Sequence, residues 1–344
     1  MRITKSVTRL EAYTPGEQPK SKSAIKLNTN ENPYPPSPKC AKVLASFDLD
    51  RLRRYPDPVF TALRQEIAKL AGTKAENVFV GNGSDEILSL AAKAFVENDE
   101  TIASLNPSYS LYKTLAAIRD VQWAGTPVGG KISIPVSASL FLWTNPNAPT
   151  GEFAEPQAIA RFARRFPGVV IVDEAYADFA TANCMDLATA QGNRNIIVMR
   201  TFSKSYSLAG LRVGFCVGPA DLIEALYKIK DSYNVDAIAQ AIALAALKDR
   251  VYHKKTVAKV IRTRGRFTKE LEKRGWNVIP SEANFVFAKP PKADAAAVFA
   301  ALKKKNIFVR YFPGELTGGR LRITIGTDGE MARLLKALDS IACS

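Results

Sequence analysis

The feature that most constrains the fold is an alternation of short apolar runs with helical patterns between about residue 37 and the mid-240s. The runs are rich in β-branched and aromatic residues, whereas intervening segments such as 60–70 repeat apolar residues at helical spacing. Unbroken apolar runs are typical of strands buried on both faces. Their alternation with helices predicts a mostly parallel sheet that is covered on both sides. The six runs are residues 78–80, 101–105, 140–143, 169–172, 196–199 and 213–217.

The pattern changes after Lys248. A long basic helix is expected over 248–274. Three strand-like segments follow it, at residues 284–288, 307–310 and 321–325, and together these elements predict a smaller α+β unit. The inward face of this helix should carry Val257, Val260, Ile261, Phe267 and Leu271.

At 344 residues the chain is too long for one simple domain. We expect a large domain at 37–246, and a second domain in which an N-terminal arm, residues 1–36, joins residues 247–344. The Pro-rich arm segment 27–36 is expected to be extended.

Composition narrows the class of protein. Hydrophobic residues make up 47% and charged residues 24%, which is ordinary for a soluble globular protein. No apolar run has membrane-spanning length, and the first residues lack the apolar core of a signal peptide, so no membrane association and a cytoplasmic location are expected. The four cysteines form no CxxC pair, which argues against a zinc site or a disulfide framework.

The formal charge of +15, dense over 248–274, raises the alternative of a basic nucleic-acid-binding module. Glu270 and Glu272 interrupt the basic run and no aromatic stacking motif accompanies it, so a solvated helix face and no nucleic-acid partner are expected. The only histidine, His253, is expected to be a solvated residue of this helix. A chain without a well-placed histidine is a poor candidate for Ser-His-Asp hydrolysis or a multi-histidine metal site, and no metal is expected.

Three of the apolar runs are each followed by a chemically distinctive side chain. Asn145 follows 140–143, Asp173 follows 169–172 and Lys204 follows 196–199. Ligands of open parallel sheets bind beyond the carboxyl ends of the strands. An amide, a carboxylate and an amine are therefore expected at one edge of the sheet.

Lys204 is the most informative of the three. It lies among Ser203, Ser205 and Ser207, with Arg212 shortly after it. Poor solvation and a second cation both lower the pKa of an amine. A neutral amine is a nucleophile that can form a Schiff base with an aldehyde.

The lysine segment resembles that of a known family. Thr201-Phe-Ser-Lys204 followed by Leu208-Ala-Gly-Leu-Arg212 is similar to fold-type-I pyridoxal-phosphate (PLP) aminotransferases, most closely to histidinol-phosphate aminotransferases. Further motifs occur in the family's order from Leu27-Asn-Thr-Asn-Glu-Asn to Arg322, nearly the entire chain. The resemblance implies an aspartate-aminotransferase-like α/β fold, with a large PLP-binding domain and a small α+β domain.

The resemblance also implies roles around the cofactor ring. Lys204 would hold PLP, Asp173 would pair with the pyridine nitrogen, and Tyr176 would donate to the phenolic oxygen. Asn145 would contact the same oxygen, with Asn147 as the alternative. A helix cap for Asp173 and a simple turn at Asn145 are the structural alternatives. In this loop Ala-Pro-Thr-Gly replaces the commoner Asn-Pro-Thr-Gly.

Residues 81–86, Gly-Asn-Gly-Ser-Asp-Glu, follow a strand and open a helical run. Gly83, Ser84 and Asp85 thus suit an anion site at a helix N-terminus, although a tight strand-to-helix turn has the same pattern. The segment is neither GxGxxG nor a P-loop, so neither a dinucleotide nor a nucleoside triphosphate is indicated.

By resemblance, the remaining phosphate contacts come from Thr201, Ser203 and Arg212. Tyr109 would stack on the PLP ring, although a core tyrosine is the alternative. Tyr55, in Arg51-Leu-Arg-Arg-Tyr, resembles the family tyrosine that reaches the cofactor of the neighbouring subunit. A homodimer with shared active sites is therefore implied.

Substrate contacts are implied near the two ends of the chain. Arg322 lies in an apolar alternating strand and would grip an α-carboxylate, unless it lies on a solvated strand face. Arg310 and Tyr13 resemble positions that contact the phosphate of histidinol phosphate. Residues 310–313, Arg-Tyr-Phe-Pro, are more aromatic than is usual in that family.

The implied activity is transamination between histidinol phosphate and 2-oxoglutarate in histidine biosynthesis. Lys204 would carry the proton of the reaction, which accounts for catalysis without a histidine. Transamination of aromatic amino acids and decarboxylation of threonine phosphate are the alternatives on the same scaffold. A non-enzymatic basic module is the alternative outside enzymes.

Overall fold

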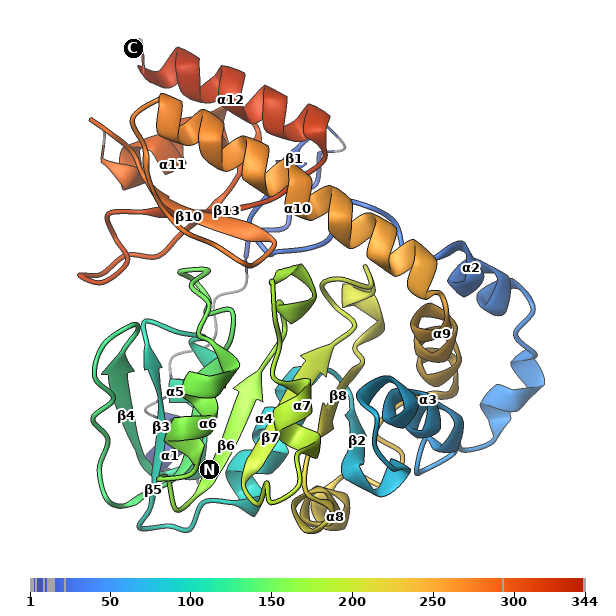
Figure 1. Ribbon diagram of the computed structural model, residues 1–344. Coiled ribbons are helices and arrows are strands. Elements are labelled where there is room, and N and C mark those ends of the chain that lie inside the picture. Colours follow the sequence, from blue (N-terminus) through green and yellow to red (C-terminus); the bar gives the residue numbers. More distant parts are fainter. Residues whose placement is uncertain are drawn as a thin grey trace.

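The computed structural model describes residues 3, 5–8, 10, 16–21, 23–292 and 294–342, and it contains two main sheets, each with its own helices (Figure 1). The larger sheet has the strand order β2-β8-β7-β6-β5-β3-β4. Strands β7, β6, β5, β3 and β4 pair with one another in parallel, whereas β8 is antiparallel to both of its neighbours, β2 and β7. The strands are β2 (Val78–Gly81), β3 (Thr101–Asn106), β4 (Gln122–Pro127), β5 (Ala138–Thr144), β6 (Val169–Asp173), β7 (Ile196–Thr201) and β8 (Gly214–Val217).

The predicted mostly parallel sheet is confirmed, and all six predicted strands are present. The sequence did not reveal β4, because this edge strand is partly exposed and its Gln-Trp-Ala-Gly-Thr-Pro sequence lacks an apolar run. The antiparallel direction of β8 was also not predicted, since periodicity does not report strand direction.

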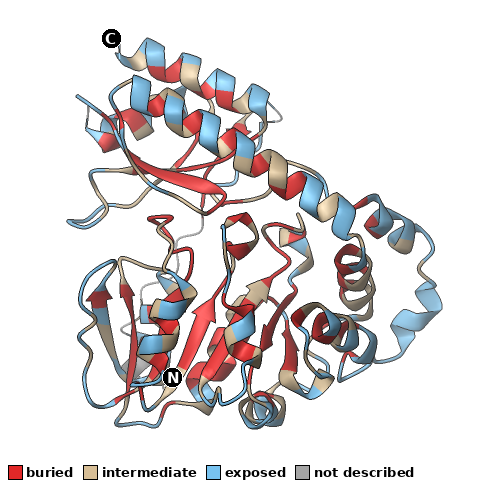
Figure 2. Ribbon diagram, viewed as in Figure 1, coloured by how far each residue is buried: buried red, intermediate tan, exposed pale blue. Residues whose placement is uncertain are grey.

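Alternate strand residues pack on opposite faces of the larger sheet. On β6, Val170 and Val172 belong to one hydrophobic cluster, and Ile171 belongs to the other. Figure 2 shows the strands as a buried layer between helices. The first cluster includes residues from α2 (Pro38–Ala45), α3 (Thr61–Ala71), α6 (Pro156–Ala163), α7 (Met185–Thr189) and α9 (Ala237–Lys248), and the second includes α4 (Ser84–Ala94), α5 (Leu111–Arg119) and α8 (Ala220–Ile229).

The smaller sheet is antiparallel, with the order β12-β13-β10-β9, and packs with the C-terminal helices. The smaller sheet and these helices form the C-terminal unit, whose elements are α10 (Arg250–Lys273), β9 (Asn277–Ile279), β10 (Phe285–Lys289), α11 (Ala295–Lys304), β12 (Arg310–Tyr311), β13 (Leu321–Thr324) and α12 (Asp328–Ala342). The arm joins this unit through β1 (Ile25–Lys26), which pairs in parallel with β11 (Ile307–Phe308). The strand-like segment at 307–310 is therefore two strands, because its two halves pair with different partners.

Short helical segments complete the described structure. They are α1 (Lys5–Thr8) and the 3-10 turns η1 (Leu49–Arg53), η2 (Ala75–Asn77), η3 (Ala177–Phe179) and η4 (Ala209–Leu211). Among the described residues, the search for a helix with the length and apolarity of a bilayer span found no candidate.

The long helix α10 runs from the smaller sheet to α9 (Figure 1). The residues expected on its inward face are buried, except Ile261, which is partly buried. The expectation that His253 is solvated is wrong. Its ring stacks on Tyr206 with centroids 4.0 Å apart, and its Nε2 lies 3.4 Å from a carboxylate oxygen of Asp178, because this end of α10 crosses the loop that follows β7.

Candidate active site

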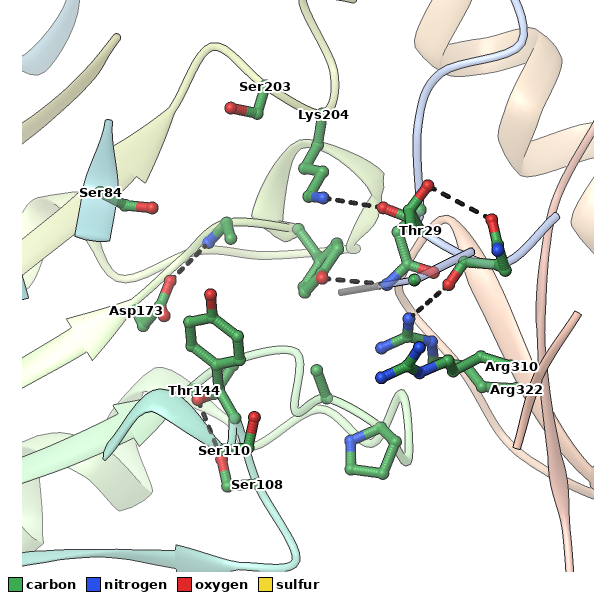
Figure 3. A pocket seen from close by; sticks show the side chains of 18 of the residues that line it. Thr29, Ser84, Ser108, Ser110, Thr144, Asp173, Ser203, Lys204, Arg310 and Arg322 are labelled. Atoms are coloured by element: carbon green, nitrogen blue, oxygen red, sulfur yellow. Dashed lines mark hydrogen bonds between the residues drawn. The ribbon is translucent and has the colours of Figure 1, made fainter. Parts of the chain in front are cut away.

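A cavity of about 510 Å³ lies beyond the carboxyl ends of the parallel strands (Figure 3). Thr144, Asp173 and Thr201, the last residues of β5, β6 and β7, line it from the larger sheet. Residues 28–31 line it from the arm, and Arg310 and Arg322 line it from the smaller sheet. The parallel strands of the larger sheet bring Thr144, Asp173 and Thr201 to one edge, as expected for an α/β sheet.

Most of the predicted site residues meet in this cavity. Gly83 flanks it without forming its wall, Tyr55 is 79% exposed, and Tyr13 lies outside the described residues. The predicted residues that line the cavity are Ser84, Asp85, Tyr109, Asp173, Tyr176, Thr201, Ser203, Lys204, Arg212, Arg310 and Arg322.

Asp173 presents a buried carboxyl group to the cavity. Its oxygens accept hydrogen bonds from Tyr112 Oη at 2.8 Å and from the Ala175 amide at 3.1 Å. Burial raises the pKa of Asp173 to about 6, against the opposing effect of the Tyr112 hydrogen bond. A cationic group in the cavity would offset the cost of ionising this carboxyl group.

Tyr112 is a site residue that the sequence analysis missed. Its ring is buried on α5, and its hydroxyl lies 2.6 Å from Thr144 Oγ1 as well as bonding Asp173. Burial and the charge of Asp173 raise the pKa of this tyrosine well above its ordinary range, so the phenol stays protonated. In the sequence Tyr112 is indistinguishable from a core aromatic residue, because nothing local shows that its hydroxyl reaches β6.

Lys204 lies in the loop after β7 and reaches across to the arm. Its Nζ donates to the carbonyl oxygen of Thr29 at 3.1 Å (Figure 3). Nζ also lies 5.9 Å from the centre of the Tyr176 ring. The amine thus sits between the arm and the end of β6.

A buried ionic network holds the loops that carry Asp173 and Lys204. Arg200 pairs with Glu174, the residue after Asp173, at 2.8 Å and with Asp178 at 3.2 Å. Ser205, the residue after Lys204, donates to the same Asp178 carboxylate. The Glu174 side chain is fully buried, and its pKa is raised by burial against the opposing influence of Arg200. The network therefore fixes the two loops relative to each other.

One end of the cavity suits an anion. Helix α4 begins at Ser84, and its N-cap residue, Gly83, supplies no side-chain cap for the first amide groups. Gly83 has φ 82°, and a Cβ atom there would lie 2.6 Å from Arg212 Nη2. The Arg212 guanidinium is also 3.3 Å from Ser203 Oγ. A helix N-terminus beside a guanidinium and a hydroxyl binds a phosphate group well.

The prediction that Asn145 faces the cofactor is wrong. Its amide group is buried, donating to the Ala154 carbonyl at 2.9 Å and accepting from the Ala154 amide at 2.8 Å. The alternative, Asn147, donates to Pro107 and Thr150 and accepts from Ser108. Both asparagines hold the loop together, and its cavity wall is formed by Ala148 and Pro149.

The opposite wall carries two arginines. Arg310 on β12 lies directly across from Arg322 on β13 in the antiparallel register. The Phe312 ring centre is 5.2 Å from the guanidinium carbon of Arg310 and 5.1 Å from that of Arg322. Arg322 also donates to the Asn28 carbonyl at 2.9 Å. Two neighbouring cations favour a substrate with a strongly anionic group.

Comparison with known sequences identifies the family. The profile described as "Aminotransferase class I and II" matches residues 22–338. The chain belongs to this aminotransferase family. Among the family's curated members, a histidinol-phosphate aminotransferase of Geobacter sp. (strain M21) is 44% identical over 342 residues, covering 98% of this chain and 97% of the relative. Another, from Microcystis aeruginosa, is 42% identical and covers 97% of each chain.

Solved aminotransferase structures agree with this assignment. Histidinol-phosphate aminotransferase from Sinorhizobium meliloti, in complex with pyridoxal-5'-phosphate, matches with a TM-score of 0.88 at 26% identity, covering 99% of this chain and 98% of that one. An aspartate aminotransferase from Thermotoga maritima matches with a TM-score of 0.80 at 19% identity, which shows the shared fold alone. The predicted fold and class of enzyme are confirmed.

Proposed function

We propose that this aminotransferase transfers an amino group between histidinol phosphate and 2-oxoglutarate, using PLP. The observation that carries the proposal is the pair Arg310 and Arg322 on one wall of the cavity that also holds Lys204 and Asp173. The named activity of full-length relatives at 44% and 42% identity supports it.

The cavity suits PLP on the chemistry of its own residues. Asp173 is a buried carboxyl group with a raised pKa, which a pyridinium nitrogen would stabilise as the anion. Lys204 offers an amine for the aldehyde, and the α4 N-terminus with Arg212 offers a phosphate site. When bound, PLP supplies an electron sink for the α-carbon of the substrate.

Each residue then has a defined task. Asp173 would pair as the anion with the ring nitrogen of PLP, and Tyr112 holds its carboxyl group in position. Tyr176 would donate to the phenolic oxygen of the cofactor. Lys204 Nζ would act as the general base that accepts the proton leaving the α-carbon of the substrate.

The two arginines account for both substrates. Histidinol phosphate carries a phosphate group where an amino acid carries its α-carboxylate, and 2-oxoglutarate carries carboxylates. We infer that Arg322 binds the α-carboxylate of 2-oxoglutarate. Arg310 and Arg322 together would bind the phosphate group of the amino donor. The Phe312 ring lies against both guanidinium groups and supports them at the cavity wall.

We also propose a homodimer in which Tyr55 reaches the neighbouring subunit's cofactor. Tyr55 is 79% exposed yet already ordered, because its ring stacks on Tyr233 with centroids 4.2 Å apart and planes 9° apart. Leu49 and Leu52 beside it are 72% and 51% exposed, which suits a contact surface. Sedimentation of the purified protein tests the dimer, and a monomer at assay concentration would refute it.

Two further proposals concern organisation and location. We propose that the domains divide at residues 36/37 and 246/247, the second boundary lying in the last turn of α9, since Ile25 and Leu27 of the arm share one hydrophobic cluster with the C-terminal unit. A cytoplasmic location is proposed because the relatives are bacterial aminotransferases.

A panel of amino donors tests the proposed substrate. Histidinol phosphate, phenylalanine, tyrosine and threonine phosphate are compared with 2-oxoglutarate as acceptor, and threonine phosphate is also assayed for decarboxylation. We expect the highest kcat/KM for histidinol phosphate. A higher kcat/KM for phenylalanine or tyrosine would refute the proposal in favour of an aromatic amino-acid aminotransferase. Lys204→Ala should remove both turnover and the visible absorbance of bound PLP.

A single variant tests the phosphate contact. Arg310→Ala should lower kcat/KM for histidinol phosphate by about 10- to 100-fold, as expected for loss of a charged hydrogen bond. It should change phenylalanine transamination much less. Equal losses of kcat/KM for histidinol phosphate and phenylalanine would show that Arg310 does not bind the phosphate group specifically.

A further inference from the structure

Three successive residues of the N-terminal arm contact three side chains of the cavity. The Asn28 carbonyl accepts from Arg322, and the Thr29 carbonyl accepts from Lys204. The third residue, Asn30, donates from Nδ2 to Tyr176 Oη at 3.0 Å. Asn30 is 1% exposed, so this side chain is fixed inside the protein. Asn30 is thus the arm residue whose side chain can affect the hydrogen bonding of the Tyr176 hydroxyl.

The orientation of the Asn30 amide is set by Thr324 on β13. Thr324 Oγ1 accepts from the Asn30 backbone amide at 3.0 Å, and it lies 3.0 Å from Asn30 Oδ1. A hydroxyl group has one proton, and a carbonyl oxygen only accepts, so Thr324 donates to Oδ1.

The reversed orientation of the amide is disfavoured. It would aim Nδ2 at Thr324, and within the described residues the Thr324 hydroxyl bonds only Asn30, so its buried proton would lose its acceptor.

With Oδ1 held by Thr324, Nδ2 is the atom that faces Tyr176. The Tyr176 oxygen thus accepts a hydrogen bond from the arm, and its own proton must point elsewhere. The ring is 8% exposed and is held edge-on against Phe285, with centroids 5.1 Å apart. Since Tyr176 lines the cavity, its proton is turned toward the cavity.

We propose that Asn30 is a positioning residue that, oriented by Thr324, directs the phenolic proton of Tyr176 to the phenolic oxygen of bound PLP. This inference rests on the proposed role of Tyr176. A hydroxyl that accepts one hydrogen bond becomes a stronger donor, so Asn30 both aims and strengthens this contact. Withdrawing negative charge from the phenolic oxygen lowers the pH at which the visible absorbance of the cofactor changes.

Asn30→Asp is the sharpest test, read in the absorbance of the holoenzyme against pH. Aspartate matches the size of asparagine and tolerates the positive φ of 57° at this position. The oxygens of the ionised carboxylate only accept, so Tyr176 must then donate to the arm and not to the cofactor. We expect the absorbance midpoint to rise by about one pH unit, the value of one ordinary hydrogen bond.

A double variant separates this effect from the added negative charge. In the Tyr176→Phe background no phenolic proton remains to be turned, so Asn30→Asp should move the midpoint far less than in the wild-type protein. Equal movement in both backgrounds would mean that the carboxylate acts through its charge, and would overturn the inference.

Two variants of Thr324 form a matched pair that tests the orientation of the Asn30 amide. Thr324→Val removes the hydroxyl that orients the amide and should raise the midpoint, whereas Thr324→Ser keeps the hydroxyl and should leave it unchanged. If Tyr176→Phe moves the midpoint but neither Asn30→Asp nor Thr324→Val does, the inference fails while the proposed function stands. If Tyr176→Phe itself has no effect, the proposed role of Tyr176 fails.

Discussion

Asp173→Asn should stabilise the cofactor-free protein while it impairs the enzyme. The pKa of Asp173 is raised from 3.8 to about 6 by burial, a shift of about two pH units or ~3 kcal/mol. Because the folded-state pKa is the higher one, the folded protein binds more protons than the unfolded protein between these values. The contribution of Asp173 to stability therefore falls as the pH rises from about 4 to about 6.

An asparagine at this position does not titrate. The difference in free energy of unfolding between variant and wild type should grow by ~3 kcal/mol between pH 4 and pH 7.5, in favour of the variant. The asparagine oxygen keeps an acceptor for the Ala175 amide, and Tyr112 can still donate to Thr144, whose Oγ1 is 2.6 Å away. Other carboxyl groups titrate equally in both proteins and cancel.

Urea unfolding of both cofactor-free proteins across this pH range measures the effect. A difference that stays constant with pH would show that the buried carboxyl group is not disfavoured in the folded state. With excess PLP the order should reverse, because the wild-type carboxylate gains its cationic partner and ligand binding stabilises the folded state. If PLP stabilised both proteins equally, Asp173 would not be the partner of the ring nitrogen.

Three further changes test the packing around the cavity. Arg200→Met leaves the fully buried carboxylate of Glu174 unpaired and should cost about 3–5 kcal/mol in urea unfolding, whereas the exposed Arg266→Met control should cost under about 1 kcal/mol. Gly83→Ala forces a side chain into a backbone with φ 82° beside Arg212, and fluorescence titration should show weaker PLP binding by about 10-fold or more. Phe312→Leu removes the ring that lies against the guanidinium groups of Arg310 and Arg322, and it should raise KM for phosphorylated and unphosphorylated donors alike. If KM changed only for the phosphorylated donor, the Phe312 ring would not support both arginines.

Residues with strong local signals could be positioned from the sequence. Asp173 and Lys204 each follow a buried apolar run, so the parallel sheet alone brings them to one edge, and both line the cavity. Arg322 stands out as a cation within an apolar strand, and Arg310, which was inferred from the family resemblance, lies opposite it in register. The positions of Asp173, Lys204 and Arg322 depend only on strand ends and strand faces.

Errors arose where hydrogen bonding decides which way a side chain faces. Asn145 was assigned to the cavity, but its amide satisfies the backbone of Ala154. His253 was assigned to solvent because its sequence neighbours are charged, but the helix crosses the loop carrying Tyr206. Buried polar groups must be paired, and the identity of the partner is not local information.

The sequence by itself determined six of the seven strands of the larger sheet, the positions of the aspartate and the lysine after two of these strands, and the family. Short apolar runs and their flanking residues suffice for this because strand burial is a local pattern. Only the tertiary structure brought Tyr112 to Asp173, joined Glu174 to Ser205 through Arg200 and Asp178, and placed Asn30 between Thr324 and Tyr176. These contacts join segments far apart in the chain, and their geometry exists only once both sheets and the arm have packed together.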